Sequence, residues 1–301
     1  MKTNFTLNSK KLLLAIVTSF FITLSSKSVA QTITSTTSGG LWSSASTWIG
    51  GVVPTSTNDV VINGTVFINN SVSCRNITIN AGDTLVDYNT SAVLTVLGNI
   101  TNNGVVGRNV SNYYNEIDVK GNIENNGIWK PYKTTLSGVS MQFLQQSAGK
   151  RFEGVWAITD TNSFVKLNSN VVFGGNENFD LNNDTLHTNG YNLQVDEMGF
   201  YDGTIISDDT IYIKNKTKIW SYVSFIGNIK LTGVFNYSDG NVFIGTLTNQ
   251  DTLINRVSNV LTIKGNIINN GYVLRDPSDY SNVIDVKGNI ENNGIWKPYK
   301  T

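Results

Sequence analysis

The sequence predicts an all-β fold, a right-handed parallel β-helix, and three observations support this expectation. The 301 residues include 41 Asn and 27 Gly but only 4 Pro, and the Asn and Gly separate short stretches rich in Val, Ile, Thr and Phe. That composition is typical of many strands joined by tight turns. A motif, G-N-I-x-N-N-G, recurs at fixed spacing, and an alternating triplet typical of a strand precedes each copy.

The first segment, residues 1–30, is expected to be a secretory signal peptide. Lys10 and Lys11 precede an apolar run that begins at Leu12, and small residues lead up to Ala30, where cleavage is expected. The apolar run is shorter than the ~20 residues of a membrane-spanning helix, and no later segment could span a membrane as a helix. We therefore expect an exported protein, either secreted or located at the outer cell surface.

Composition limits the remaining function classes. The 22 basic and 22 acidic residues cancel, so the chain lacks the basic patch that nucleic-acid binding requires. Cys74 is the only cysteine, which excludes a disulfide within the chain, and we expect its side chain to be a small buried apolar group.

The repeats have two periods, a short one nested in a long one. The long period separates two identical eighteen-residue stretches, Ile117 to Thr134 and Ile284 to Thr301. The short period is a 23-residue offset within each of two pairs of the motif: Gly98–Gly104 and Gly121–Gly127, then Gly265–Gly271 and Gly288–Gly294. A fixed period of this length is the signature of a solenoid.

Each 23-residue unit predicts one coil of short strands and turns. In Leu94–Val96, the first and third side chains face inward and the middle one faces outward. The Asn residues of successive turns are expected to form hydrogen-bonded ladders between coils. A leucine-rich repeat lacks support because its leucine pattern and helical half are absent, and a β-sandwich does not explain nearly identical units. We divide the mature chain into an N-terminal cap segment, 31–58, and a β-solenoid, 59–301.

The end of the chain carries a further expectation. A bare last coil would expose strand edges, which natural solenoids cover with a cap. We expect the sequence to be truncated within a longer array of repeats, or else the open end to be a site of self-association.

The start of the mature chain resembles a known group of proteins. The stretch from Leu41 to Pro54, with Trp42 and Trp48, and then Asn58 to Ile62, is similar to the W-x5-W-x-G-G-x-x-P and D-x-V-x-I entry of large repeat-containing surface proteins of Bacteroidetes. It also resembles the opening of the eight-glycine extracellular domain. The resemblance implies a β-helix-like stack, export by the type IX system and an adhesin-like role at the cell surface. The C-terminal sorting domain that the resemblance also implies is not found among residues 1–301, so the export route does not follow from the resemblance alone.

Several residues are candidate contacts for ligands. Trp42 and Trp48 are interpreted first as an apolar lid over the first coil and second as platforms for a sugar ring. The aromatic residues of the duplicated segment are the other candidate glycan contacts, in loops like the one that holds Tyr113 and Tyr114: Trp129, Tyr132, Trp296 and Tyr299. Four threonines follow an aspartate and precede an apolar residue, as in the O-glycosylation acceptor of exported Bacteroidetes proteins: Thr84, Thr185, Thr210 and Thr252. The alternative is that each aspartate caps a turn.

Catalytic and metal signals are weak. His187 is the only histidine, so a His-rich zinc site cannot form within one chain. Asp208 and Asp209 resemble the paired aspartates of pectin-hydrolysing β-helices, but adjacent residues on a strand point to opposite faces. A calcium nonapeptide is only partly matched at 174–180, so we expect no cofactor, with Ca²⁺ as the alternative.

We expect a non-enzymatic, exported cell-surface solenoid that adheres to extracellular glycans or other surfaces. The alternative is a carbohydrate-active module, a polysaccharide hydrolase or lyase, which would also need converging ionisable side chains.

Overall fold

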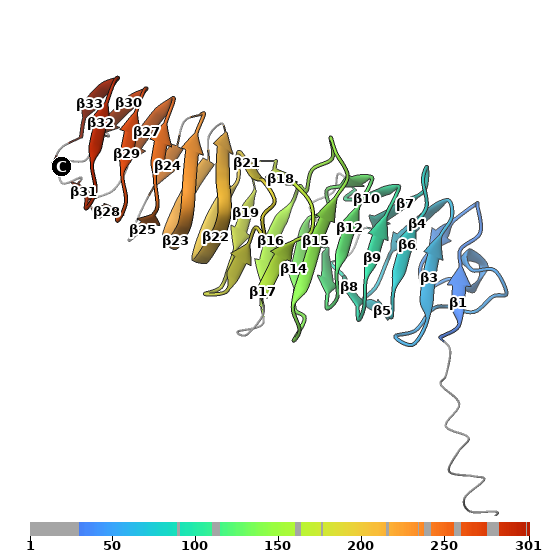
Figure 1. The fold of residues 1–301 in the computed structure, drawn as a ribbon. Coiled ribbons are helices and arrows are strands. Elements are labelled where there is room, and N and C mark those ends of the chain that lie inside the picture. Colours follow the sequence, from blue (N-terminus) through green and yellow to red (C-terminus); the bar gives the residue numbers. More distant parts are fainter. Residues whose placement is uncertain are drawn as a thin grey trace, which may run out of the picture. The chain divides into compact units, whose positions relative to one another are not determined.

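The computed structural model describes residues 30–88, 91–109, 115–159, 164–175, 177–214, 217–233, 235–237, 242–255, 260–275, 283–298 and 300–301. From Thr32 to Thr301 these residues form one unit, a parallel β-solenoid in which each coil stacks on the preceding one (Figure 1). The described residues contain no α-helix, and a single 3-10 turn spans Ala45–Thr47. The predicted all-β parallel solenoid is therefore confirmed, whereas residues 1–29 of the expected signal peptide lie outside the described residues.

Each coil contributes one strand to each of three faces, and the strands on a face pair in parallel with those of neighbouring coils. Two long strands, β22 (Gly199–Lys214) and β23 (Thr217–Leu231), each follow all three faces in turn. Face A consists of β1 (Thr32–Thr34), β3 (Asp59–Ile62), β6 (Ile77–Ile79), β9 (Ile100–Asn102), β12 (Ile123–Asn125), β15 (Gln142–Gln146), β17 (Phe164–Leu167), β20 (Thr185–His187), the middle parts of β22 and β23, β25 (Val242–Ile244), β28 (Val260–Ile263) and β31 (Val283–Val286).

The other two faces are built in the same way. Face B consists of β5 (Val72–Cys74), β8 (Val93–Val96), β11 (Glu116–Val119), β14 (Lys133–Leu136), β16 (Val155–Ile158), β19 (Asn178–Asp180), the first parts of β22 and β23, β24 (Phe235–Tyr237), β27 (Thr252–Asn255), β30 (Tyr272–Arg275) and β33 (Ile295–Lys297). Face C consists of β2 (Gly40–Leu41), β4 (Thr65–Ile68), β7 (Thr84–Asp87), β10 (Val105–Gly107), β13 (Ile128–Trp129), the bridging residue Phe152, β18 (Val171–Gly174), β21 (Leu193–Asp196), the last parts of β22 and β23, β26 (Leu247–Asn249), β29 (Ile267–Asn269) and β32 (Ile290–Asn292).

The alternation seen in the sequence fixes which side chains enter the core. In β8, Leu94 and Val96 are fully buried, and Thr95 between them points outward. Ladders of Asn link the turns that follow, because the backbone N–H of Asn99 donates to Oδ1 of Asn76 at 2.8 Å and the next coil repeats the bond. The predicted asparagine ladders are thus confirmed.

One corner of each 23-residue coil requires glycine. A Cβ at Gly121 would lie 2.5 Å from the carbonyl carbon and oxygen of Gly98, in the turn of the coil before it. Any larger residue would therefore push these turns apart and break the pairing on both sides of the corner.

Aromatic side chains form a column inside the central coils. Trp129 contacts Phe152 edge to face with 5.8 Å between ring centroids, and Phe152 stacks on Phe173 at 5.6 Å. The column continues through Phe179 and Phe200, which also stack. These rings fill the interior with large apolar surfaces, so each coil is stabilised mainly by its neighbours.

The two identical eighteen-residue segments occupy different faces. In the first copy, β11 lies on face B, β12 on face A and β13 on face C. In the second copy, β31 lies on face A, β32 on face C and β33 on face B. The second copy is therefore rotated by one third of a coil relative to the first. The same sequence follows the same strand and turn path on either set of faces, so its path is set locally and its burial is set by its neighbours.

Candidate functional site

Two adjoining depressions on face C form the best candidate site. One measures about 350 Å³ and the other about 430 Å³, and Tyr212 lines both. We name the pair the face C groove. Its lining residues are Asn170, Val171, Val172, Asn192, Gln194, Thr210, Tyr212, Lys214, Asn228, Ile229, Lys230, Thr246 and Thr248.

Strand register aligns the floor of the groove. Ile211 and Ile213 are buried, so Tyr212 between them points outward and is half-buried. Parallel pairing places Gln194 before Tyr212, then Lys230 and Thr248 after it, in one row across β21, β22, β23 and β26. A second row precedes the first by two positions and holds Asn192, Thr210, Asn228 and Thr246.

Two side-chain amides of the groove, those of Asn170 and Asn228, have a defined orientation. Oδ1 of Asn170 accepts the backbone N–H of Asn192 at 3.0 Å, and Oδ1 of Asn228 accepts that of Thr246 at 3.2 Å. Because the carbonyl oxygens are used between coils, the exposed amide nitrogens remain available to donate. The hydroxyl of Tyr212 makes no hydrogen bond with any other described residue. The groove therefore offers one aromatic ring among several hydrogen-bonding groups.

The charged side chains that line the groove are all positive. Among the residues that line it in the described part of the chain there is no carboxylate, whereas Lys214 and Lys230 are both present. Lys214 lies opposite Asp196 in the register of β21 and β22. Lys230 forms no ion pair with a described residue, so its positive charge is available in the groove.

A smaller depression on face A differs in its chemistry. It measures about 220 Å³ and its lining includes Glu124, Phe143, Gln145 and Asn168. Nδ2 of Asn168 donates to Oε1 of Gln145 at 3.0 Å, so these amides already satisfy each other. Among the described residues, the lining of this depression includes an acidic side chain, Glu124, and no lysine.

The aromatic residues predicted to contact glycans are mostly inside the solenoid. Trp42, Trp48 and Trp129 are at most 2% exposed, which corrects their assignment as ligand platforms. Nε1 of Trp48 donates to the carbonyl oxygen of Trp42 at 2.7 Å, and Nε1 of Trp129 donates to Oγ1 of Thr134 at 3.1 Å. Strand register turns Trp129 inward, whereas Trp42 and Trp48 follow β2 and pack edge to face against each other with 5.0 Å between ring centroids.

The remaining predicted contacts lie nearer the surface. Tyr132 is half-buried. Trp296 is also half-buried, and its Nε1 donates to Oγ1 of Thr301 at 3.0 Å. Tyr299 lies outside the described residues, as do Tyr113 and Tyr114. The structure does not bring these side chains together into one site.

The four threonines predicted as O-glycosylation sites are all half-exposed: Thr84, Thr185, Thr210 and Thr252. Each meets the requirement that it face outward, but they are spread over faces A, B and C. Oδ1 of Asp83 accepts the backbone N–H of Gly64 at 2.6 Å, and Oδ1 of Asp209 accepts that of Thr210 at 2.7 Å. These aspartates hold turns, as the alternative interpretation requires, and modification of the threonines stays a prediction.

The candidate catalytic residues lie at a corner between faces A and C. Asp208 and Asp209 are both exposed, which corrects the expectation that they point to opposite faces. The register between β22 and β23 shifts at this corner, so the strand alternation does not apply. Nδ1 of His187 lies 3.7 Å from Asp208 but accepts the backbone N–H of Asn189 at 2.9 Å. That nitrogen therefore cannot donate to the carboxylate, and the pair does not form an acid and base dyad.

The incomplete calcium motif forms a turn. Oδ1 of Asp180 accepts the backbone N–H of Asn182 at 2.9 Å, while Asn176 lies outside the described residues. Within the described ranges, no group of three or more His, Cys, Asp or Glu side chains is placed to hold a metal ion.

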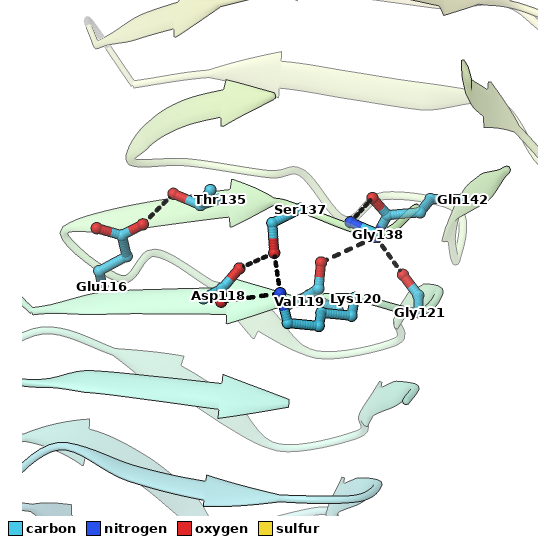
Figure 2. A network of polar contacts seen from close by, with 9 residues as sticks. All are labelled: Glu116, Asp118, Val119, Lys120, Gly121, Thr135, Ser137, Gly138 and Gln142. Carbon is cyan, nitrogen blue, oxygen red and sulfur yellow. Dashed lines mark hydrogen bonds and ion pairs between the residues drawn. The ribbon is translucent and has the colours of Figure 1, made fainter. Parts of the chain in front are cut away.

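Charged side chains of the first repeated segment connect neighbouring coils on face B. Figure 2 shows Asp118 bonded to Ser137 of the next coil, and Lys120 contacting the same hydroxyl at 3.1 Å. Nε2 of Gln142 donates to the carbonyl oxygens of Val119 and Gly121 at 2.9 and 2.6 Å. These groups stabilise stacking and are not free to bind a ligand.

The sequence contains a signal for the face C groove that motif reasoning missed. Gln194, Tyr212, Lys230 and Thr248 follow one another at a constant interval of eighteen positions. Asn or Thr, then an apolar residue, then a polar one recur at this interval, although the residues themselves differ from coil to coil. Coils this short have little chain left for loops, which leaves this part of face C uncovered.

Comparison with protein-family models, with curated proteins and with solved structures finds no match for this chain. Fold and site together define its class: a parallel β-solenoid with a polar groove on one face. In the described part of the chain, no helix is long and apolar enough to cross a membrane.

Proposed function

We propose that the protein is an exported cell-surface β-solenoid that adheres to extracellular glycans along one face. The face C groove is the observation that carries this proposal, because Tyr212 is surrounded there by amide and hydroxyl groups. Sugar rings bind through apolar contact with an aromatic ring and hydrogen bonds to their hydroxyls, and the groove supplies both. The leader-like residues 1–30 support export to the surface.

Adhesion is favoured over cleavage by the chemistry of the lining. Glycoside hydrolysis uses two carboxyl groups on opposite sides of the scissile bond. The lining residues of the face C groove in the described chain include none. A polysaccharide in this groove would be held without a group to protonate or attack it. A carbohydrate-active enzyme, either hydrolase or lyase, is the alternative function.

A panel of immobilised polysaccharides tests the proposal with the purified mature chain. We expect binding that Tyr212→Ala weakens about fivefold, because a stacked ring contributes on the order of 1 kcal/mol. Phe164→Ala is the matched control, since Phe164 is an aromatic residue on face A with 53% of its surface exposed. Failure to bind any glycan would overturn the proposal. Release of reducing ends or unsaturated products would establish the enzymatic alternative instead.

A further inference from the structure

We infer that the face C groove selects an extended acidic polysaccharide, with a carboxylate against Lys230 and a sugar ring on Tyr212. This inference rests on the proposed glycan-binding function and adds the chemical class of the glycan. It follows from the charge, the direction and the spacing of the groups in the groove.

The charge of the groove favours an anion. Lys230 is half-buried and has no carboxylate partner in the described chain, so its ammonium group remains available to a ligand. Asp196 faces Lys214 in the strand register, so Lys214 adds less net charge. Asp209, at the edge, already accepts the backbone N–H of Thr210. A carboxylate on the glycan would form a charge-assisted hydrogen bond with Lys230.

The direction of the groove favours an extended chain. Gln194, Tyr212, Lys230 and Thr248 follow one another across successive coils, along the solenoid axis. Neighbouring strands lie ~4.8 Å apart, so the whole groove from β18 to β26 covers roughly 19 Å. The strand spacing is close to the length of one sugar ring in an extended polysaccharide. Each ring can therefore meet one coil, with a carboxylate next to the ring that stacks on Tyr212.

The second row strengthens the fit. The amide nitrogens of Asn170 and Asn228 are left to donate, and the hydroxyls of Thr210 and Thr246 can donate or accept. Donor groups suit a ligand rich in carboxylate and hydroxyl oxygens. The depression on face A contains Glu124 and would repel the same ligand.

Polygalacturonic acid and its fully methyl-esterified form test the inference, because they share one backbone and differ in charge. The mature wild-type chain and its Lys230→Gln, Tyr212→Ala and Lys166→Gln variants are titrated with each polymer by calorimetry. Lys166 is the matched control, a half-buried lysine on face A. Circular dichroism establishes that each variant is folded.

The expected result is tighter binding of the acid than of the ester, with salt weakening the acid complex. Lys230→Gln should weaken binding of the acid by about threefold to fivefold, as for a solvent-exposed ion pair, and leave the ester unaffected. Equal binding of both polymers, still sensitive to Tyr212→Ala, would overturn the acidic class and leave the glycan-binding function standing. An equal loss with Lys166→Gln would overturn the assignment to face C. No binding to any polysaccharide of the wider panel would overturn both proposals.

Discussion

The duplicated segment allows the effect of burial on stability to be measured for the same residue in two copies of one local sequence. Ile123 and Ile290 occupy the same position in identical eighteen-residue stretches, but Ile123 is 1% exposed and Ile290 is 45% exposed. Ile123 lies on face A between Ile100 and Leu144 of the neighbouring coils. Truncating a buried Ile to Ala costs about 2–5 kcal/mol, because it removes apolar contacts and leaves a cavity. Ile290→Ala should cost less than about 1 kcal/mol, because much of that side chain already contacts water.

Urea unfolding of the 301-residue protein measures both variants. With an unfolding slope of roughly 3 kcal/mol per M, Ile123→Ala should lower the midpoint by about 1 M, and Ile290→Ala by only a few tenths. Tryptophan fluorescence is a suitable probe, because Trp129 and Trp156 are buried near this coil. Equal shifts for the two variants would refute the claim that neighbouring coils, and not the local sequence, set burial.

Three further predictions concern the core and the coils. Burial, aided by the charge of Asp59, raises the pKa of the Cys74 thiol to about 12. At pH 8 the folded protein should therefore react with a thiol reagent far more slowly than the unfolded chain. Rapid labelling of the native protein would contradict this expectation. Burial also raises the pKa of the Asp87 carboxyl, so the folded state loses stability as pH rises through that pKa. Asp87→Asn should therefore unfold at a higher urea concentration than wild type at pH 7 but not at pH 3. An unchanged midpoint at pH 7 would refute this expectation. Deleting the segment 98–120 should preserve the β-sheet circular dichroism, because it removes one whole coil. Deleting Thr101 alone should abolish the native spectrum, because it exchanges inward and outward side chains. An equal loss of the β-sheet spectrum in the two deletions would argue against the register.

The repeated coils were the part of the fold that the sequence predicted best. Leu94–Val96 and Ile117–Val119 lie within β8 and β11, and the 23-residue period is the pairing register itself. The period is visible in the sequence because each repeated coil contains the same motif, with a glycine that its corner requires and asparagines that bond to the next coil. Strand alternation then identifies the side chains that point inward, and the neighbouring coils decide how far they are buried.

The candidate site was less predictable, because it depends on contacts between coils. Trp129 stands near Pro131 in what looked like a surface loop, yet pairing with β10 turns its ring into the core. In the sequence, Tyr212 is only one residue of a predicted strand. The residues beside it in the structure, Gln194 and Lys230, are distant in the sequence and of different types, so no repeated motif marks the site. The one-third rotation of the second copy depends on the lengths of all the coils between the copies, which no local pattern reveals.

Lysine acetylation of the full mature chain, read by mass spectrometry with and without polygalacturonic acid, tests most directly whether face C holds the glycan. At a ligand concentration ten times Kd, a residue covered in the complex should be modified about tenfold more slowly. We expect protection of Lys230 and not of Lys166 on face A. Protection of Lys166 with Lys230 still fully reactive would contradict it.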